Sequence, residues 1–163
     1  MKFSRRHFLT FAAAALALLS VKTADARETV PLAGYRYSAG SVVISTSART
    51  LYYVLGNGQA IRYPVGVGKA GMAWSGTGFI ARKHLRPAWS DERGGPVIPG
   101  GSPRNPMGAA ALGLDRGNYA IHGTNDPSSI GGYVSHGCIR MHNEDIMDLY
   151  RRTSIGTNVY VLQ

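Results

Sequence analysis

The chain has 163 residues, which suits one domain of ordinary size and excludes a second large one. Its formal net charge is +9, yet its basic residues are mostly single and scattered, and no Lys/Arg run is interleaved with aromatic residues. This composition disfavours a nucleic-acid-binding protein, and we expect no nucleic-acid partner.

The first 26 residues have the order of an export signal. A basic opening, Met1–His7, is followed by an uncharged, alanine-rich run, Phe8–Val21, and then by the small-x-small sequence Ala24-Asp25-Ala26. We therefore predict a signal peptide over residues 1–26 that is cleaved after Ala26. The apolar run is shorter than the roughly 20 residues of a membrane span, so an uncleaved anchor is the less favoured alternative.

Paired arginines favour the twin-arginine type of signal. The sequence Ser4–Leu9 places the pair just before two apolar residues and resembles the twin-arginine pattern, with a general secretory signal as the alternative. The twin-arginine type implies a bacterial protein in the periplasm or cell envelope. Cleavage would leave 14 basic and 8 acidic residues, about +6, which suits a surface that faces anionic envelope polymers. The charged residues removed are Lys2, Arg5, Arg6, Lys22 and Asp25.

The first part of the mature chain is a polar connection followed by strands. Residues 27–40 are polar and punctuated by glycine, and we expect them to be loosely held. β-Branched and aromatic residues predict strands over 41–46, 51–55 and 59–67, and a glycine-rich turn joins the last two into a hairpin. Pro64 lies inside the third strand and indicates an edge or a bulge.

The later part alternates short strands with long connections. Strands are predicted over 77–82, 118–122 and 157–162, and a proline- and glycine-rich loop covers 87–106. A helix is predicted to begin at Asn143, whose side chain can cap the free N–H groups. These elements predict a mainly β domain with one or two short helices and its functional site on loops.

Cys138 is the only cysteine of the chain. An exported protein with one cysteine cannot form an internal disulfide, so its thiol is buried and inert, paired with another chain, or reactive. The neighbours His136, Gly137 and Arg140 favour a reactive thiol over a core residue.

A thiol nucleophile needs a base, because a thiol of ordinary pKa is only a few per cent thiolate at neutral pH. His122, His136 and His142 are all available, and the residues alone do not choose among them. Gly137 permits a tight turn, so the N–H groups of Gly137 and Cys138 could face the oxyanion of an acyl-transfer intermediate.

Two further features complete the candidate site. Arg140 could hold a substrate carboxylate with its two-pronged donors. A different class of site, a metal centre, is a weaker alternative, because zinc accepts mixed ligands of the kind offered by His122, His136, Cys138 and His142.

Two segments together resemble the signature of the L,D-transpeptidase catalytic domain family (YkuD-like). They are Ile121-His122-Gly123-Thr124 and, with Cys138 sixteen residues after His122, Ser135-His136-Gly137-Cys138-Ile139-Arg140-Met141. The segments 41–68, 105–114 and 143–145 also resemble that family. The likeness thus extends over most of the mature chain and assigns a catalytic domain to 41–163. Residues 74–78 depart from it, because they lack a Thr-Pro pair that the family commonly carries.

The resemblance implies a β-sandwich-like fold and a cysteine acyltransferase that acts on the stem peptides of peptidoglycan. Cys138 would attack the carbonyl of the third stem residue, expel the terminal D-alanine and form a thioester. An amine of a second stem would then resolve the thioester into a 3→3 cross-link in cell wall biogenesis. This chemistry needs no cofactor or metal, and carbapenems would acylate the same cysteine.

The resemblance also assigns roles to individual residues. His122 would be the general base, oriented by a backbone carbonyl at Gly123. Ser135 and His136 would line the pocket of the nucleophile, with Gly137 in support. Arg140 would support the site or, with Thr124, bind substrate.

Three other outcomes share this site. Water as the acceptor would make the protein an L,D-carboxypeptidase, and a lysine amine would make it a transferase that attaches envelope proteins to peptidoglycan. A wall-binding module without chemistry is disfavoured by the intact pair of His122 and Cys138.

Overall fold

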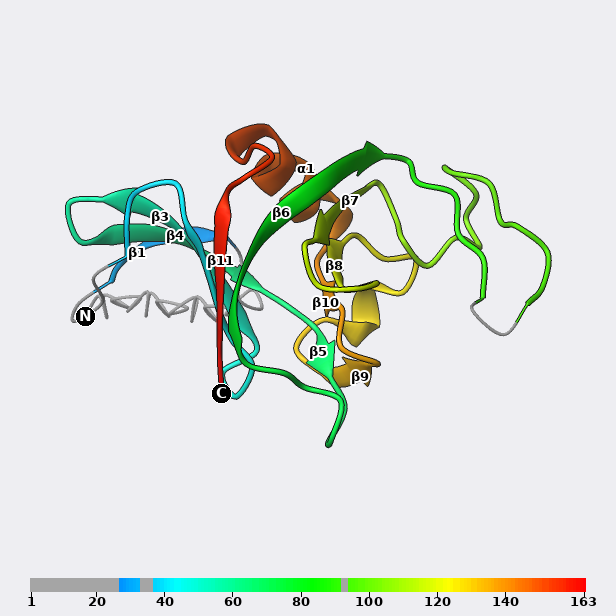
Figure 1. Cartoon of the computed structure of the whole chain (residues 1–163), viewed down its shortest axis with the longest axis horizontal. Helices are drawn as coiled ribbons and strands as arrows, with labels where there is room; N and C mark the ends of the chain where they lie inside the picture. The colour runs from blue at the N-terminus through cyan, green and yellow to red at the C-terminus, as the bar shows by residue number, and fades with distance from the viewer. Residues whose placement is uncertain (1–26, 33–36, 92–93) are drawn as a thin grey trace, which may run out of the picture.

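The computed structural model describes residues 27–32, 37–91 and 94–163, and the predicted export signal lies outside them. Nine strands form one sheet in the order β1-β4-β3-β2-β11-β6-β7-β8-β10, and β5 and β9 form a separate pair (Figure 1). The strands are β1 (Glu28–Pro31), β2 (Val42–Ser45), β3 (Thr50–Gly56), β4 (Gln59–Pro64), β5 (Val67–Gly68), β6 (Gly76–Leu85), β7 (Ala110–Leu114), β8 (Ala120–His122), β9 (Tyr133–Ser135), β10 (Ile139–Arg140) and β11 (Asn158–Leu162). The mainly β prediction is confirmed.

The helices are few, as predicted. The described residues contain one α-helix, α1 (Asn143–Arg152), and one 3-10 helix, η1 (Pro127–Ser129). Among them, no helix is both long and apolar enough to cross a membrane.

The first half of the sheet is an antiparallel meander of β2, β3 and β4. The predicted hairpin is confirmed, and both central residues of its turn, Asn57 and Gly58, have positive φ, as the turns that suit the twist of a two-residue hairpin require. Pro64 is the last residue of β4 and lies beyond the part of β4 that pairs with β1, so its missing N–H costs no ladder bond on that side.

The N-terminal connection is more ordered than predicted. Residues Glu28–Pro31 form β1, which pairs antiparallel with β4, and Arg62 reaches Glu28 across the pair at 2.9 Å. The expectation of a loosely held segment is therefore wrong for this stretch. Backbone pairing to an otherwise unpaired sheet edge stabilises it, although its sequence shows no strong strand pattern.

The second half of the sheet carries the candidate site. The long strand β6 pairs with β11 at its start and with β7 over the rest, and its register shifts between Ile80 and Arg82. β7 continues antiparallel to β8, and β10 then pairs parallel to β8 at the far edge. The strand β11 joins the two halves, because it is parallel to β2 and antiparallel to β6.

The main core lies between the sheet and α1, which packs against β7 (Figure 1). Ile146 and Leu149 of the helix are fully buried, as its predicted apolar face requires. The predicted start of the helix at Asn143 is correct, but the predicted cap is wrong. The N-cap residue is His142, no side chain caps the helix, and the Asn143 side chain is engaged elsewhere.

The predicted long loop is present between β6 and β7, at residues 86–109. In its described part, the only strand-like contact is an isolated bridge between Trp89 and Ile98. Figure 1 shows this loop extending well away from the sheet. It returns to β7 beside the end of β8, where His122 lies.

Candidate active site

Strand pairing brings His122 and the cysteine segment to one edge of the sheet. In the parallel pair of β8 and β10, Ile121 is opposite Ile139 and His122 is opposite Arg140. Ile121 and Ile139 are buried in the core. Because side chains alternate along a strand, His122 and Arg140 take the other face, and Cys138 immediately precedes β10.

The turn before Cys138 is held by the hydroxyl of Ser135. The Ser135 Oγ accepts a hydrogen bond from the Gly137 N–H at 3.0 Å and donates to the Cys138 carbonyl at 2.6 Å. Ser135 is buried, so it shapes the turn from inside instead of lining an open pocket. The expectation that the Gly137 N–H faces an oxyanion is wrong, because this donor is already used within the turn.

Cys138 is partly exposed, so its thiol is accessible from solvent. Its Sγ lies 3.8 Å from the Asn118 carbonyl and can donate its proton there. Asn118 precedes β8, so the turn between β7 and β8 lies against the nucleophile.

His122 has the orientation of a general base. Its side chain is only 4% exposed, and its Nδ1 lies 2.6 Å from the Gly123 carbonyl oxygen. A carbonyl can only accept, so Nδ1 carries the proton and Nε2 keeps the basic lone pair in the neutral ring. The contact expected between His122 and Gly123 is therefore present.

The environment of His122 favours its neutral form. Burial, with a smaller contribution from the positive charge of Arg140, lowers the pKa of His122 to about 4, against the opposing effect of hydrogen bonds with the Gly123 and Pro106 carbonyls. At neutral pH the imidazole is unprotonated and able to accept a proton. A resting ion pair of thiolate and imidazolium is therefore disfavoured.

The other two candidate bases, His136 and His142, lie in different surroundings from His122. His136 is exposed, although its neighbours in the motif are largely buried. His142 occupies the N-cap position of α1, where its carbonyl accepts from the Ile146 N–H. In the part of the chain that the structure describes, no three His, Cys, Asp or Glu side chains come together as metal ligands. The metal-site alternative therefore has no geometric support.

Arg140 is half-buried beside His122. Its backbone N–H and carbonyl both pair with Gly66, at 2.8 and 2.9 Å. Within the described residues, its Nε is buried and has no hydrogen-bond partner. A buried guanidinium donor without a partner is costly, and a bound acceptor group would satisfy it.

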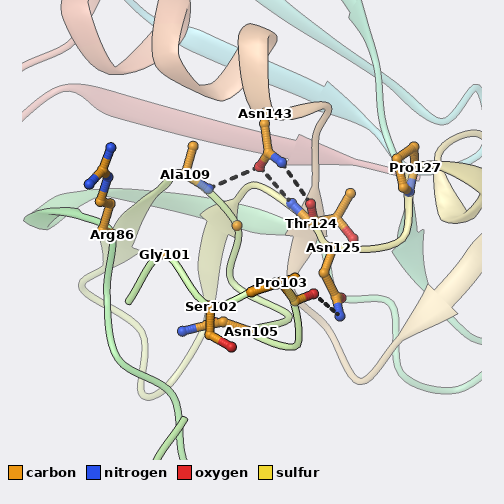
Figure 2. Close-up of a pocket in the computed structure, with 11 residues that line it drawn as sticks. Arg86, Gly101, Ser102, Pro103, Asn105, Ala109, Thr124, Asn125, Pro127 and Asn143 are labelled. Atoms are coloured by element: carbon orange, nitrogen blue, oxygen red, sulfur yellow. Dashed lines mark hydrogen bonds between the residues drawn. The ribbon is translucent and has the colours of Figure 1, made fainter. Parts of the chain in front are cut away.

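Sequence reasoning missed the role of Asn143. Its Oδ1 accepts from the N–H groups of Ala109 and Thr124, at 2.9 and 3.2 Å, and its Nδ2 donates to the Thr124 carbonyl at 2.9 Å (Figure 2). A Cβ at Gly108 or Gly123 would lie 2.2 or 2.3 Å from this Oδ1, so both positions require glycine. Asn143 thus fastens the end of the long loop to the segment that orients His122.

A cavity of about 530 Å³ opens beside the hydrogen bonds of Asn143, which we call the Asn143 clamp (Figure 2). Thr124 lies in its wall, and the Thr124 Oγ1 is paired with the backbone of Asp126, at 3.0 Å from its N–H and 3.3 Å from its carbonyl. The lining residues are Arg86, Gly101, Ser102, Pro103, Asn105, Gly108, Ala109, Thr124, Asn125, Pro127 and Asn143. The long loop therefore forms one wall of a cavity next to the His122 segment.

Sequence comparison places this arrangement among known proteins. The L,D-transpeptidase catalytic domain matches residues 39–161. The probable L,D-transpeptidase YbiS of Escherichia coli is 40% identical over 136 residues, which cover 74% of this chain and 43% of that protein. The putative L,D-transpeptidase YqjB of Bacillus subtilis is 35% identical over 137 residues, covering 80% and 73%. The chain thus spans less than half the length of YbiS.

Solved structures agree in fold. An L,D-transpeptidase from Mycobacterium tuberculosis superposes with a TM-score of 0.61 at 19% identity, covering 77% of this chain and 58% of that one. A mutant L,D-transpeptidase from Enterococcus faecium gives 0.63 at 16% identity, covering 77% and 50%. Because the family match over residues 39–161 covers most of the sheet, this chain belongs to the L,D-transpeptidase catalytic domain family.

Proposed function

We propose that this protein is a peptidoglycan L,D-transpeptidase that forms 3→3 cross-links through a thioester on Cys138. One observation carries the proposal. His122 is buried in its neutral form with Nδ1 fixed on the Gly123 carbonyl, at the sheet edge where the partly exposed Cys138 lies. A neutral imidazole and an accessible thiol at the same sheet edge are the two groups that acyl transfer from a peptide needs.

The first half-reaction transfers the acyl group to the enzyme. The Cys138 Sγ attacks the carbonyl carbon of the third stem residue while His122 Nε2 takes the thiol proton. The tetrahedral intermediate collapses, the bond from carbon to the D-alanine nitrogen breaks, and the imidazolium returns the proton to the departing amine. A thioester on Cys138 and free D-alanine result.

The second half-reaction transfers the acyl group to an amine. An amine of a second stem attacks the thioester, His122 takes one of its protons, and the thiol leaves with that proton. A new amide and the free enzyme result. In this scheme Arg140 offers its unpartnered Nε to a polar group of the substrate, and Thr124 helps to form the wall of the neighbouring cavity.

The cell envelope is the proposed place of action. The order of charge and hydropathy in residues 1–26 supports export, with a twin-arginine type of signal. A net positive mature chain would be drawn to anionic envelope polymers.

Incubation of the purified protein with tetrapeptide stems tests the function directly. We expect cross-linked dimers and released D-alanine, detected by mass spectrometry. Free tripeptides alone would show an L,D-carboxypeptidase instead, and stems attached to an added envelope protein would show protein attachment. Unchanged tetrapeptides, with a titratable free thiol, would overturn the proposal.

Carbapenem binding gives a second, independent test. We expect meropenem to add one acyl group to the intact protein, and peptide mapping to place it on Cys138. A free thiol that takes up no meropenem would count against an acyl-accepting cysteine.

A further inference from the structure

Trp74 and Tyr119 stack beside the turn that carries Cys138. Their ring centroids are 5.5 Å apart and their planes differ by only 9°. The Arg116 guanidinium lies over the Trp74 ring, 4.9 Å from its centroid. Trp74 belongs to the connection before β6, whereas Tyr119 and Arg116 belong to the turn before β8, so the stack joins two separate parts of the chain.

Trp74 also contacts the cysteine turn directly. Its indole Nε1–H donates a hydrogen bond of 3.2 Å to the Gly137 carbonyl, 63 residues away in sequence. This carbonyl belongs to the residue immediately before Cys138. The indole therefore fixes the outer side of the peptide unit that leads into the nucleophile.

Tyr119 occupies the space in which a side chain at position 137 would lie. A Cβ on Gly137 would be 2.4 Å from the Tyr119 ring, and Gly137 has a φ of 124°, which side-chain-bearing residues rarely adopt. Tyr119 also follows Asn118, whose carbonyl is the contact of the thiol. The Tyr119 ring thus lies against the turn, and the preceding residue, Asn118, contacts Sγ through its carbonyl.

We propose that Trp74 and Tyr119 are positioning residues, which hold the turn from Ser135 to Cys138 from outside while the Ser135 hydroxyl holds it from inside, and so fix the thiol where it reacts. This inference rests on the proposed function only where its test measures the rate of stem cross-linking. The two rings are half-buried and pack at the margin of the main core, so their removal should affect the placement of the thiol more than the stability of the fold.

The test compares Trp74→Ala and Tyr119→Ala with two conservative variants, Trp74→Phe and Tyr119→Phe. We expect each alanine variant to lower kcat for stem cross-linking by about ten- to a hundredfold, because a misplacement of about 1 Å costs a factor of this order, with KM nearly unchanged. Tyr119→Phe keeps the ring and should retain nearly full activity. Trp74→Phe keeps the stack but loses the indole donor and should be intermediate.

A matched control comes from the only other tryptophan. Trp89 lies in the long loop, and Trp89→Phe should leave kcat unchanged. The double variant Trp74→Ala/Tyr119→Ala should lose no more than the worse single variant, because both rings act through one turn. Additive losses, a change in KM alone, or equal losses in Tyr119→Phe and Tyr119→Ala would overturn the inference.

A second readout separates this inference from the proposed function. The rate at which iodoacetamide alkylates Cys138 at pH 7 needs no peptidoglycan substrate. We expect Trp74→Ala to slow this alkylation severalfold relative to wild type and Trp89→Phe, with circular dichroism showing a folded protein. If wild type alkylates and Trp74→Ala is slow but neither cross-links stems, the proposed function fails and the positioning role stands. If alkylation is equal in all variants, the positioning role fails. If Trp74→Ala does not fold, the same comparison is made with Trp74→Phe.

Discussion

His122 and Arg140 are direct register partners in the parallel pair of β8 and β10, so a permanent positive charge lies beside the buried imidazole. The charge of Arg140 and the burial of the ring both lower the pKa of His122. Together they place the pKa of His122 at about 4, well below its ordinary value. The same feature that keeps the imidazole ready to accept a proton also makes folding depend on pH.

Between pH 4 and 6.5 the unfolded chain binds a proton at His122 and the folded chain does not. Stability should therefore rise with pH through this window, and be lost as pH falls from 6.5 toward 4. The shift corresponds to at most about 3 kcal/mol, by the usual conversion of 1.36 kcal/mol per pKa unit. Urea unfolding at several pH values measures it.

His122→Gln is the control for this pH dependence, because other carboxyl groups titrate in the same range. The variant should lose part of the slope of unfolding free energy against pH between 4 and 6.5, while His136→Gln, at an exposed site, should keep it. Identical slopes in wild type and His122→Gln would contradict the assigned pKa.

Removal of the thiol should separate chemistry from folding. Cys138 is only partly buried and its Sγ lies 3.8 Å from the Asn118 carbonyl, a long contact, so Cys138→Ala should unfold within about 1 kcal/mol of wild type. Cross-linking of stems and acylation by meropenem should both be abolished. Cross-linked dimers formed by this variant, measured by mass spectrometry, would refute a cysteine mechanism.

Asn143 should matter to both stability and activity, although its side-chain hydrogen bonds go to Ala109 and Thr124 and not to His122 or Cys138. Asn143→Ala removes three hydrogen bonds to the backbone of Ala109 and Thr124. We expect a loss of about 1–3 kcal/mol in the free energy of unfolding and a lower kcat, because the Gly123 carbonyl that orients His122 lies within this clamp. Glu144→Ala, at an exposed neighbouring position, should change neither quantity appreciably.

Sequence patterns predicted the strands that are rich in β-branched and aromatic residues. Strands β3 and β4 and the hairpin between them follow from this composition and from the glycine-rich turn. β7, with the sequence AALGL, is buried at every residue, so it carries no alternation and was not predicted. β10 has only two residues, too few for any periodicity, yet it fixes the register of the site.

The residues proposed to react were accessible from the sequence, and their supports were not. Cys138 stood out as the single cysteine, and the family resemblance chose His122 over His136 and His142, a choice that the residues alone left open. The burial of His122 and its contact with the Gly123 carbonyl are seen in the fold. Trp74 acts on Gly137 across 63 positions. Contacts between residues so far apart in the sequence follow from the order of the strands in the sheet, and no pattern in the neighbouring sequence indicates them.

The hydroxyl of Tyr63 on β4 donates to the Asp148 Oδ2 on α1 at 2.7 Å, in the core and away from the active site. Burial alone would raise the pKa of Asp148, but hydrogen bonds from Arg152 and Tyr63 outweigh it and hold this pKa below its ordinary value. Tyr63→Phe removes a bond to a charged acceptor, so we expect a loss of about 1.5–3 kcal/mol in unfolding free energy with kcat unchanged. Tyr160→Phe is the control, because the Tyr160 ring packs on Tyr37 in a second core cluster, separate from the core between sheet and helix. An equal loss of unfolding free energy in both variants would contradict a specific contribution from this bond. A fall in kcat for Tyr63→Phe alone would show that the bond does more than hold the helix against the sheet.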